Sequence, residues 1–132
     1  MKQRQWGRII NIASVHGLVA SVNKSAYVSA KHGLVGFTKA SALENAKSGV
    51  TINAICPGWI LTPLIQKQID IIAEKRKVSN DEAINILVSE KQPSATMGTP
   101  EDLGALATFL CTQHAKQITG SSYTLDGGWT AQ

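Results

Sequence analysis

Short apolar segments alternate along the chain with longer segments whose apolar positions recur every three or four residues. The short segments, at 7–14, 50–56 and 122–125, are rich in β-branched residues and predict strands, the first of them buried. The stretch from Ser25 to about Ala46 predicts a helix whose apolar stripe is formed by Tyr27, Ala30, Leu34, Phe37, Ala40 and Leu43. Strands that alternate with helices imply parallel pairing in a layered α/β fold.

Cap residues locate further helices in the second half of the chain. The stretch from about 63 to 92 has a polar, helical pattern, and Ser79-Asn80-Asp81-Glu82 inside it has the form of a capping box, which places a helix start near Asn80. At 99–102, a threonine cap, a proline and two acids predict a helix that runs to about Thr112 with Leu103, Leu106, Ala107 and Leu110 on one face. Three strands make a small parallel sheet, so we interpret residues 1–132 as one domain that forms part of a larger sheet.

Composition favours a globular protein with a small anionic ligand. Of the 132 residues, 43% are hydrophobic, which is enough for a buried core, and no apolar run is long enough to span a membrane. The net charge is +4, and all nine acids lie at Glu44 or beyond. The basic residues are dispersed and only 5% of residues are aromatic, which argues against a nucleic-acid surface.

The two cysteines and the start of the chain bear on metals and location. Cys56 and Cys111 are far apart in sequence, so we expect neither a zinc site nor a disulfide framework, and a reducing compartment such as the cytoplasm fits. The first residues are basic and an apolar stretch follows, but polar residues interrupt that stretch. We therefore identify no targeting segment.

A serine, a tyrosine and a lysine are the candidate catalytic residues. Tyr27 and Lys31 are four residues apart on the expected helix and share a face. A nearby ammonium stabilises a phenolate, so the hydroxyl could give or take a proton near neutral pH. Such a pair alone is more often a packed tyrosine beside a solvated lysine. Ser14, however, ends a predicted strand, and the carboxyl ends of strands are where open α/β sheets bind ligands.

Several motifs together resemble the short-chain dehydrogenase/reductase family. They are Asn11-Ile12-Ala13-Ser14, Tyr27-Val28-Ser29-Ala30-Lys31, Asn53-Ala54-Ile55-Cys56-Pro57-Gly58-Trp59-Ile60-Leu61-Thr62, Ile118-Thr119-Gly120 and Asp126-Gly127-Gly128, in the family's order and spacing. The resemblance implies the C-terminal half of a Rossmann-like, doubly wound parallel sheet. It also implies hydride transfer with a nicotinamide cofactor, for which we expect NAD, and a homo-oligomer, usually a tetramer.

The resemblance also implies roles for individual residues. Tyr27 would be the proton donor and acceptor, Lys31 would support the tyrosine and bind the nicotinamide ribose, and Ser14 would orient the substrate carbonyl or alcohol. Candidate cofactor contacts are Pro57, Gly58, Trp59, Ile60 and Thr62, in addition to Tyr27 and Lys31.

Four further segments resemble those family members that interconvert D-3-hydroxybutyrate and acetoacetate with NAD. The segments are 14–21, 24–27, 66–69 and 126–132. The resemblance assigns the substrate carboxylate to His16, Lys24 and Gln68, and a wall of the pocket to Trp129. A cation with neutral donors can hold a carboxylate, and an indole can exclude water and limit chain length.

Some family features have no counterpart in these residues. There is no G-x-x-x-G-x-G segment, and the family's cofactor-selecting acid and catalytic asparagine are also missing. We therefore expect the chain to be the catalytic half of an enzyme that alone neither binds NAD well nor turns over. One alternative is an inactive chain that acts only as a pairing module. Another is a 3-ketoacyl-thioester reductase that uses NADPH, against which the set of His16, Lys24, Gln68 and Trp129 argues.

Overall fold

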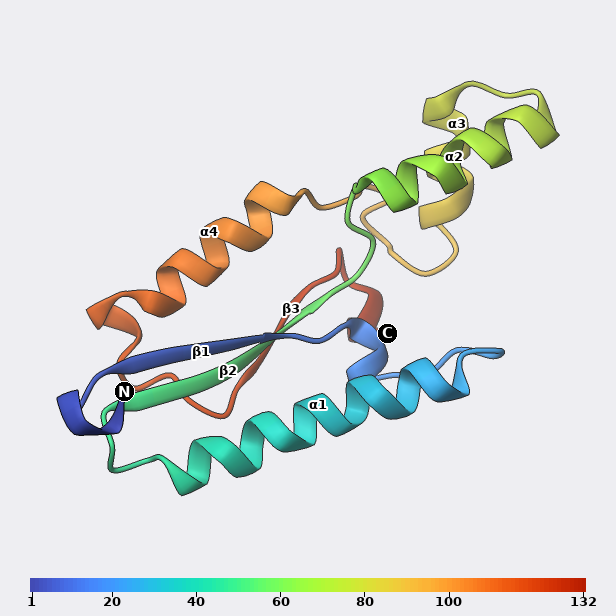
Figure 1. Ribbon diagram of the computed structural model, residues 1–132. Coiled ribbons are helices and arrows are strands. Elements are labelled where there is room, and N and C mark those ends of the chain that lie inside the picture. The colour runs from blue at the N-terminus through green and yellow to red at the C-terminus, as the bar shows by residue number, and fades with distance from the viewer.

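Three parallel strands form the centre of the molecule in the computed structural model, which describes residues 1–132 (Figure 1). Strand β1 spans Gly7–Ile12, β2 spans Val50–Pro57 and β3 spans Ser122–Leu125, and they lie in the order β1-β2-β3. Both pairings are parallel, with Gly7 opposite Val50 and Ala54 opposite Ser122. The predicted α/β fold with parallel pairing is confirmed.

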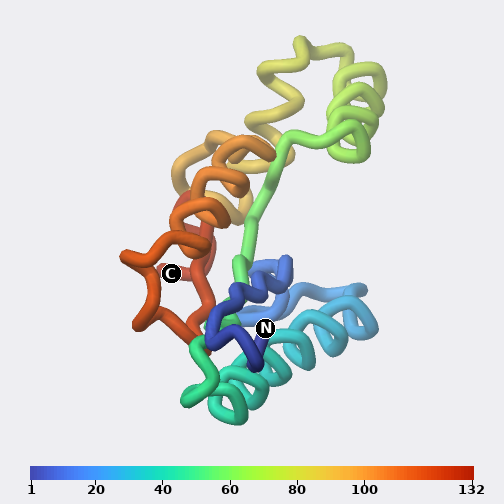
Figure 2. The backbone as a smooth tube through the Cα atoms, turned by 60° about the vertical axis from the view of Figure 1, so that its left-hand side comes forward, coloured from blue at the N-terminus to red at the C-terminus, as the bar shows by residue number.

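Helices cover both faces of this sheet. Helix α1 (Ser25–Glu44) lies on one face and α4 (Pro100–Cys111) lies on the other, and both views of the molecule show this arrangement (Figures 1 and 2). Helices α2 (Pro63–Arg76) and α3 (Asn80–Val88) pack together and project beyond the carboxyl end of β2. The shorter 3₁₀ turns are Lys2–Arg4, Val15–Gly17, Gln113–Ala115 and Trp129–Ala131. No helix combines the length and the apolar character that crossing a membrane requires.

The predicted helix starts at Asn80 and Pro100 are confirmed. The Ser79 hydroxyl accepts the Glu82 N–H at 3.2 Å, and the Glu82 carboxylate accepts the Ser79 N–H at 3.1 Å. Thr99 and Asp102 form the same reciprocal pair, and the hydrogen bonds that Thr99 donates lower the pKa of Asp102. These capping boxes satisfy N–H groups that the first helical turn leaves without partners.

The buried face of α1 differs from the predicted stripe. Phe37 and Leu43 are 60% and 80% exposed, whereas the buried residues of the helix are Val35, Thr38, Ser41 and Ala42. The Thr38 hydroxyl accepts a hydrogen bond of 2.8 Å from the Asn11 side chain of β1. Small and hydroxyl-bearing residues therefore form the face that packs on the sheet, and most of the apolar stripe faces solvent.

Strand β1 is shorter and more exposed than predicted. It ends at Ile12, because the extended Ser14 turns its side chain to cap the Val15–Gly17 turn. Ile9 and Ile12 are 36% and 48% exposed, since β1 lies at the edge of the three-stranded sheet. The core lies instead along β2, which is buried over its whole length and packs on α1 through one of its faces.

Candidate active site

A cavity of about 900 Å³ opens at the carboxyl ends of β1 and β2. Every predicted site residue except Lys31 lines it: Ser14, His16, Lys24, Tyr27, Pro57, Gly58, Trp59, Ile60, Thr62, Gln68 and Trp129. They come from the turn after β1, the start of α1, the segment that joins β2 to α2, helix α2 itself and the turn after β3. Parallel strands bring their carboxyl ends to one edge, which explains why distant segments meet there.

The three candidate catalytic residues lie at the end of β1 and the start of α1. Ser14 is buried, and its hydroxyl accepts the His16 N–H at 3.1 Å. Tyr27 is 47% exposed in the first turn of α1. The Lys31 ammonium donates to the Ile12 carbonyl at 3.0 Å and lies 5.6 Å from the centre of the Tyr27 ring. A fixed positive charge therefore stands beside the phenol, just outside the cavity lining.

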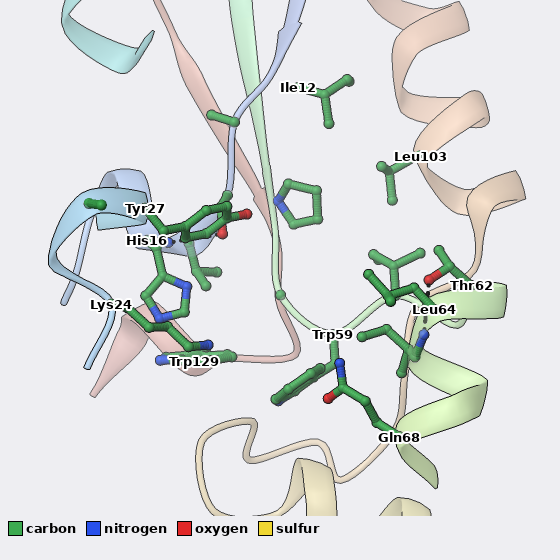
Figure 3. A pocket seen from close by; sticks show the side chains of 18 of the residues that line it. Ile12, His16, Lys24, Tyr27, Trp59, Thr62, Leu64, Gln68, Leu103 and Trp129 are labelled. Atoms are coloured by element: carbon green, nitrogen blue, oxygen red, sulfur yellow. Dashed lines mark hydrogen bonds between the residues drawn. The ribbon is translucent and has the colours of Figure 1, made fainter. Parts of the chain in front are cut away.

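Aromatic rings form one wall of the cavity (Figure 3). The His16 ring meets Tyr27 edge-on with ring centres 5.8 Å apart, and it meets Trp129 edge-on at 5.4 Å. The Trp59 and Trp129 rings are 6.2 Å apart and tilted by 31°. These distances are those of favourable aromatic pairs. The Lys24 ammonium lies 5.9 Å from the centre of the Trp59 ring, within the range of a cation–π contact.

The charge of the cavity comes from one residue. Burial lowers the pKa of His16 below its ordinary value of 6.5, and the nearby Lys24 charge lowers it further. His16 is therefore neutral at pH 7. Its Nε2 atom lies 3.0 Å from the Ser21 hydroxyl. Lys24 is the only charged residue in the lining, which contains no acid. The site therefore favours a small anion.

Gln68 completes the polar part of the lining from the opposite side. Figure 3 shows it on α2, across the cavity from Lys24 and His16. Further lining residues that the sequence analysis did not identify include Asn23, Leu64 and Leu103. Apolar residues such as the two leucines carry no signal that separates a cavity wall from a core. The chain contains no group of three or more His, Cys, Asp or Glu residues that could hold a metal ion.

Comparisons with known proteins agree with this geometry. A family model described as "Enoyl-(Acyl carrier protein) reductase" matches residues 1–130. The chain is 61% identical over all 132 residues to a D-beta-hydroxybutyrate dehydrogenase of Cupriavidus necator, and covers 51% of that protein. The chain belongs to the short-chain dehydrogenase/reductase family. The predicted resemblance is thereby confirmed, and the chain spans about half the length of the curated relatives it matches.

Solved structures share the fold of the chain. An L-sorbose reductase from Gluconobacter frateurii, complexed with NADPH and L-sorbose, superposes with a TM-score of 0.92 at 30% identity. The match covers the whole of this chain and 50% of the reductase chain. A 4-hydroxyisoleucine dehydrogenase mutant, complexed with NADH and succinate, superposes with a TM-score of 0.84 at 35% identity. That match covers 98% of this chain and 50% of the dehydrogenase chain. The predicted Rossmann-like architecture is therefore confirmed.

Proposed function

We propose that this chain carries the proton-transfer and substrate-holding residues of an NAD-dependent dehydrogenase that interconverts D-3-hydroxybutyrate and acetoacetate. The observation that carries the proposal is the single cavity onto which Ser14, Tyr27 and the lone cation Lys24 all open. The name of the 61% identical relative supports this substrate. A neighbour complexed with both NADH and a carboxylate, succinate, supports the class of ligand.

Tyr27 performs the proton transfer in this proposal. In reduction its hydroxyl gives a proton to the substrate carbonyl oxygen, and in oxidation the phenolate takes that proton back from the alcohol. The Lys31 ammonium lies 5.6 Å from the ring centre and places a positive charge beside the phenol. The Ser14 hydroxyl accepts the His16 N–H, so its own proton is free to be donated to the substrate oxygen.

Lys24, His16 and Gln68 hold the substrate carboxylate. Lys24 supplies the charge, and the neutral His16 and Gln68 side chains can supply hydrogen-bond donors. Trp129 and Trp59 close the end of the cavity beyond Lys24, which favours a short acid.

The residues present fit the nicotinamide end of a cofactor. Ile12, Pro57 and Ile60 give the cavity an apolar surface for a flat ring, and the Lys31 ammonium at its edge can donate to a ribose hydroxyl. Contacts from Gly58, Trp59 and Thr62 complete the proposed set. A bound nicotinamide supplies or accepts the hydride, and the chain supplies placement and the proton.

A chimaera tests this function. This chain replaces the matched half of the Cupriavidus necator relative, and NADH formation from D-3-hydroxybutyrate is measured with the unmodified relative as reference. We expect activity with D-3-hydroxybutyrate and little with the L enantiomer. A folded chimaera that is inactive would support the pairing-module alternative, and preference for acetoacetyl-CoA with NADPH would support the thioester reductase; either result overturns the proposal.

Tyr27→Phe tests the assigned proton donor in the same chimaera. Removal of a proton-transfer group typically lowers the rate by about 10²–10⁴-fold, and the ring remains to fill its place. Tyr123→Phe, which removes the other tyrosine hydroxyl from β3, is the matched control and should retain activity. Activity of Tyr27→Phe within a few-fold of the parent would exclude Tyr27 from the step.

We also propose that the protein assembles with copies of itself through α1 and works in the cytoplasm. The exposed stripe on α1 includes Phe37 and Leu43, and Gly33 and Gly36 leave room there for close approach by another helix. Phe37→Glu should shift the sedimentation of the chimaera toward smaller species, whereas Lys39→Glu should not. The cytoplasmic location is supported by the free, exposed thiol of Cys111.

A further inference from the structure

A second cavity of about 590 Å³ lies behind the tryptophan pair of the first. The two cavities share three lining residues, which are Lys24, Trp59 and Trp129. Beyond this wall the second cavity is lined by apolar side chains, among them Ile72 of α2 and Ile86 of α3, and by the charged side chains of Arg76, Glu90 and Lys91. The Trp59–Trp129 pair therefore separates the space around Tyr27 from a second space with both apolar and charged walls.

Trp59 has no side-chain hydrogen bond that fixes its place in this wall. Its indole N–H is buried and lacks an acceptor. Its backbone N–H, however, donates to Gln92 Oε1 at 3.1 Å. The Gln92 amide nitrogen donates in turn to the Thr96 carbonyl, and Gln92 is only 2% exposed. A buried side chain thus ties the tryptophan backbone to the segment that follows α3.

Two glycines make room for Gln92 between the exits of β2 and β3. A Cβ atom on Gly58 would lie 2.5 Å from Gln92 Oε1, and one on Gly127 would lie 2.6 Å from Gln92 Cγ. The neighbouring Ser94 N–H donates to the Gly127 carbonyl at 3.0 Å. Because Trp59 follows the first glycine and Trp129 lies two residues beyond the second, Gln92 contacts the backbone segments that carry both rings.

We propose that Gln92 is a positioning residue that holds Trp59 against Trp129, and that this wall limits how far the carboxylate of an accepted acid can lie from its ketone. The consequence for substrate length rests on the proposed function, whereas the hold on Trp59 does not. Without the two hydrogen bonds of Gln92, the segment after β2 can shift and open the wall toward the second cavity. An acid whose carboxylate lies further from its ketone then gains space beyond Trp59.

Gln92→Met tests the hold on Trp59, because methionine has a similar shape but cannot form either bond. Asn53→Leu is the matched control: Asn53 is 1% exposed and also bridges two backbone groups, the Ile118 carbonyl and the Ser121 N–H, but away from both cavities. The readout is the near-ultraviolet circular dichroism signal of the Trp59–Trp129 pair, measured both in the 132-residue chain and in the chimaera. All variants also carry Trp6→Phe, which removes the third tryptophan of the chain. We expect Gln92→Met to lose the pair's signal, as Trp59→Phe does, and Asn53→Leu to retain it.

Gln92→Glu supplies a rescue. A protonated carboxyl has one donor and one acceptor, like the amide, whereas a carboxylate cannot donate to the Thr96 carbonyl. The signal of the pair should therefore be close to normal at low pH and fall as the introduced carboxyl ionises. A signal that is unchanged in Gln92→Met, or lost equally in Asn53→Leu, would overturn the positioning role.

Kinetics in the chimaera test the limit on chain length. The ratio of kcat/KM for acetoacetate to that for 4-oxopentanoate, whose carboxylate lies one methylene further from its ketone, should fall by roughly tenfold in Gln92→Met and Trp59→Ala, because pocket contacts discriminate one methylene by about this factor. Asn53→Leu should leave the ratio unchanged, and equal ratios in all variants would overturn the chain-length role. If no chimaera is active, the proposed function fails, and the circular dichroism still decides whether Gln92 holds Trp59.

Discussion

Replacing Lys24 with methionine should weaken binding of the substrate carboxylate and leave the reacting end of the cavity intact. Lys24 is the only charge in the lining, and its ammonium lies beside the Trp59 ring. Methionine keeps most of the apolar stem that packs there, so the variant removes the charge with little loss of packing.

The size of the effect follows from the surroundings of the ammonium. Hydrogen bonds to charged groups contribute roughly 1.5–3 kcal/mol. Lys24 is exposed to solvent, which screens its charge, so we expect the lower end of this range. That corresponds to a rise in KM for acetoacetate of about tenfold, since about 1.4 kcal/mol is a factor of ten.

The assay compares acetoacetate with methyl acetoacetate, which has the same ketone but no charge. KM and kcat are measured for both in the chimaera that carries Lys24→Met, with Lys39→Met as the control on an exposed lysine of α1. KM for acetoacetate should rise about tenfold, while KM for the ester should change little. An equal loss on both ketones would refute the assignment and make Lys24 a structural residue.

A second measurement on the same variant tests the electrostatic part of the reasoning. Burial and the Lys24 charge together lower the pKa of His16, with burial the larger cause. Removal of the charge should therefore raise the pKa of His16 in an NMR titration, without bringing it to the ordinary value of 6.5. An unchanged pKa would mean that the two side chains do not interact as the structure indicates.

Three further predictions concern stability and cofactor binding. The pKa of His16 is lowered in the folded state, so the neutral side chain contributes fully to stability above about pH 6.5, and this contribution is lost as the pH falls through the lower folded pKa. Melting temperatures of the parent should therefore drop more steeply below pH 6.5 than those of His16→Gln. Gly58→Ala should destabilise the fold by about 1–3 kcal/mol in urea unfolding, because the added Cβ would meet Gln92 and the Asp126 backbone, whereas Gly104→Ala on an open face of α4 should not destabilise it. The 132-residue polypeptide alone should bind NADH more weakly than micromolar in calorimetric titration, because none of its segments has the glycine-rich form that contacts a pyrophosphate; micromolar binding would contradict this.

Local sequence determined the elements of this fold. The strand at 122–125, the start of α1 at Ser25 and the capping boxes at Ser79 and Thr99 all match the structure, because each depends on residues that are neighbours in the chain. The family motifs likewise identified eleven of the residues that line the cavity, but not others such as Asn23 and Leu103. Their catalytic and binding roles remain predictions until the substitutions are made.

Tertiary structure decided which faces are buried and which side chains meet. Hydrophobic spacing assigned the wrong face of α1 to the core: the face that packs on the sheet carries Val35, Thr38, Ser41 and Ala42, and Thr38 accepts a hydrogen bond from Asn11 of β1. The neutral state of His16 depends on its burial between Tyr27 and Trp129. The position of Gln92 between two glycine turns has no local signal at all. Such contacts join segments far apart in sequence, and their energies exist only once the strands have brought those segments to the same edge of the sheet.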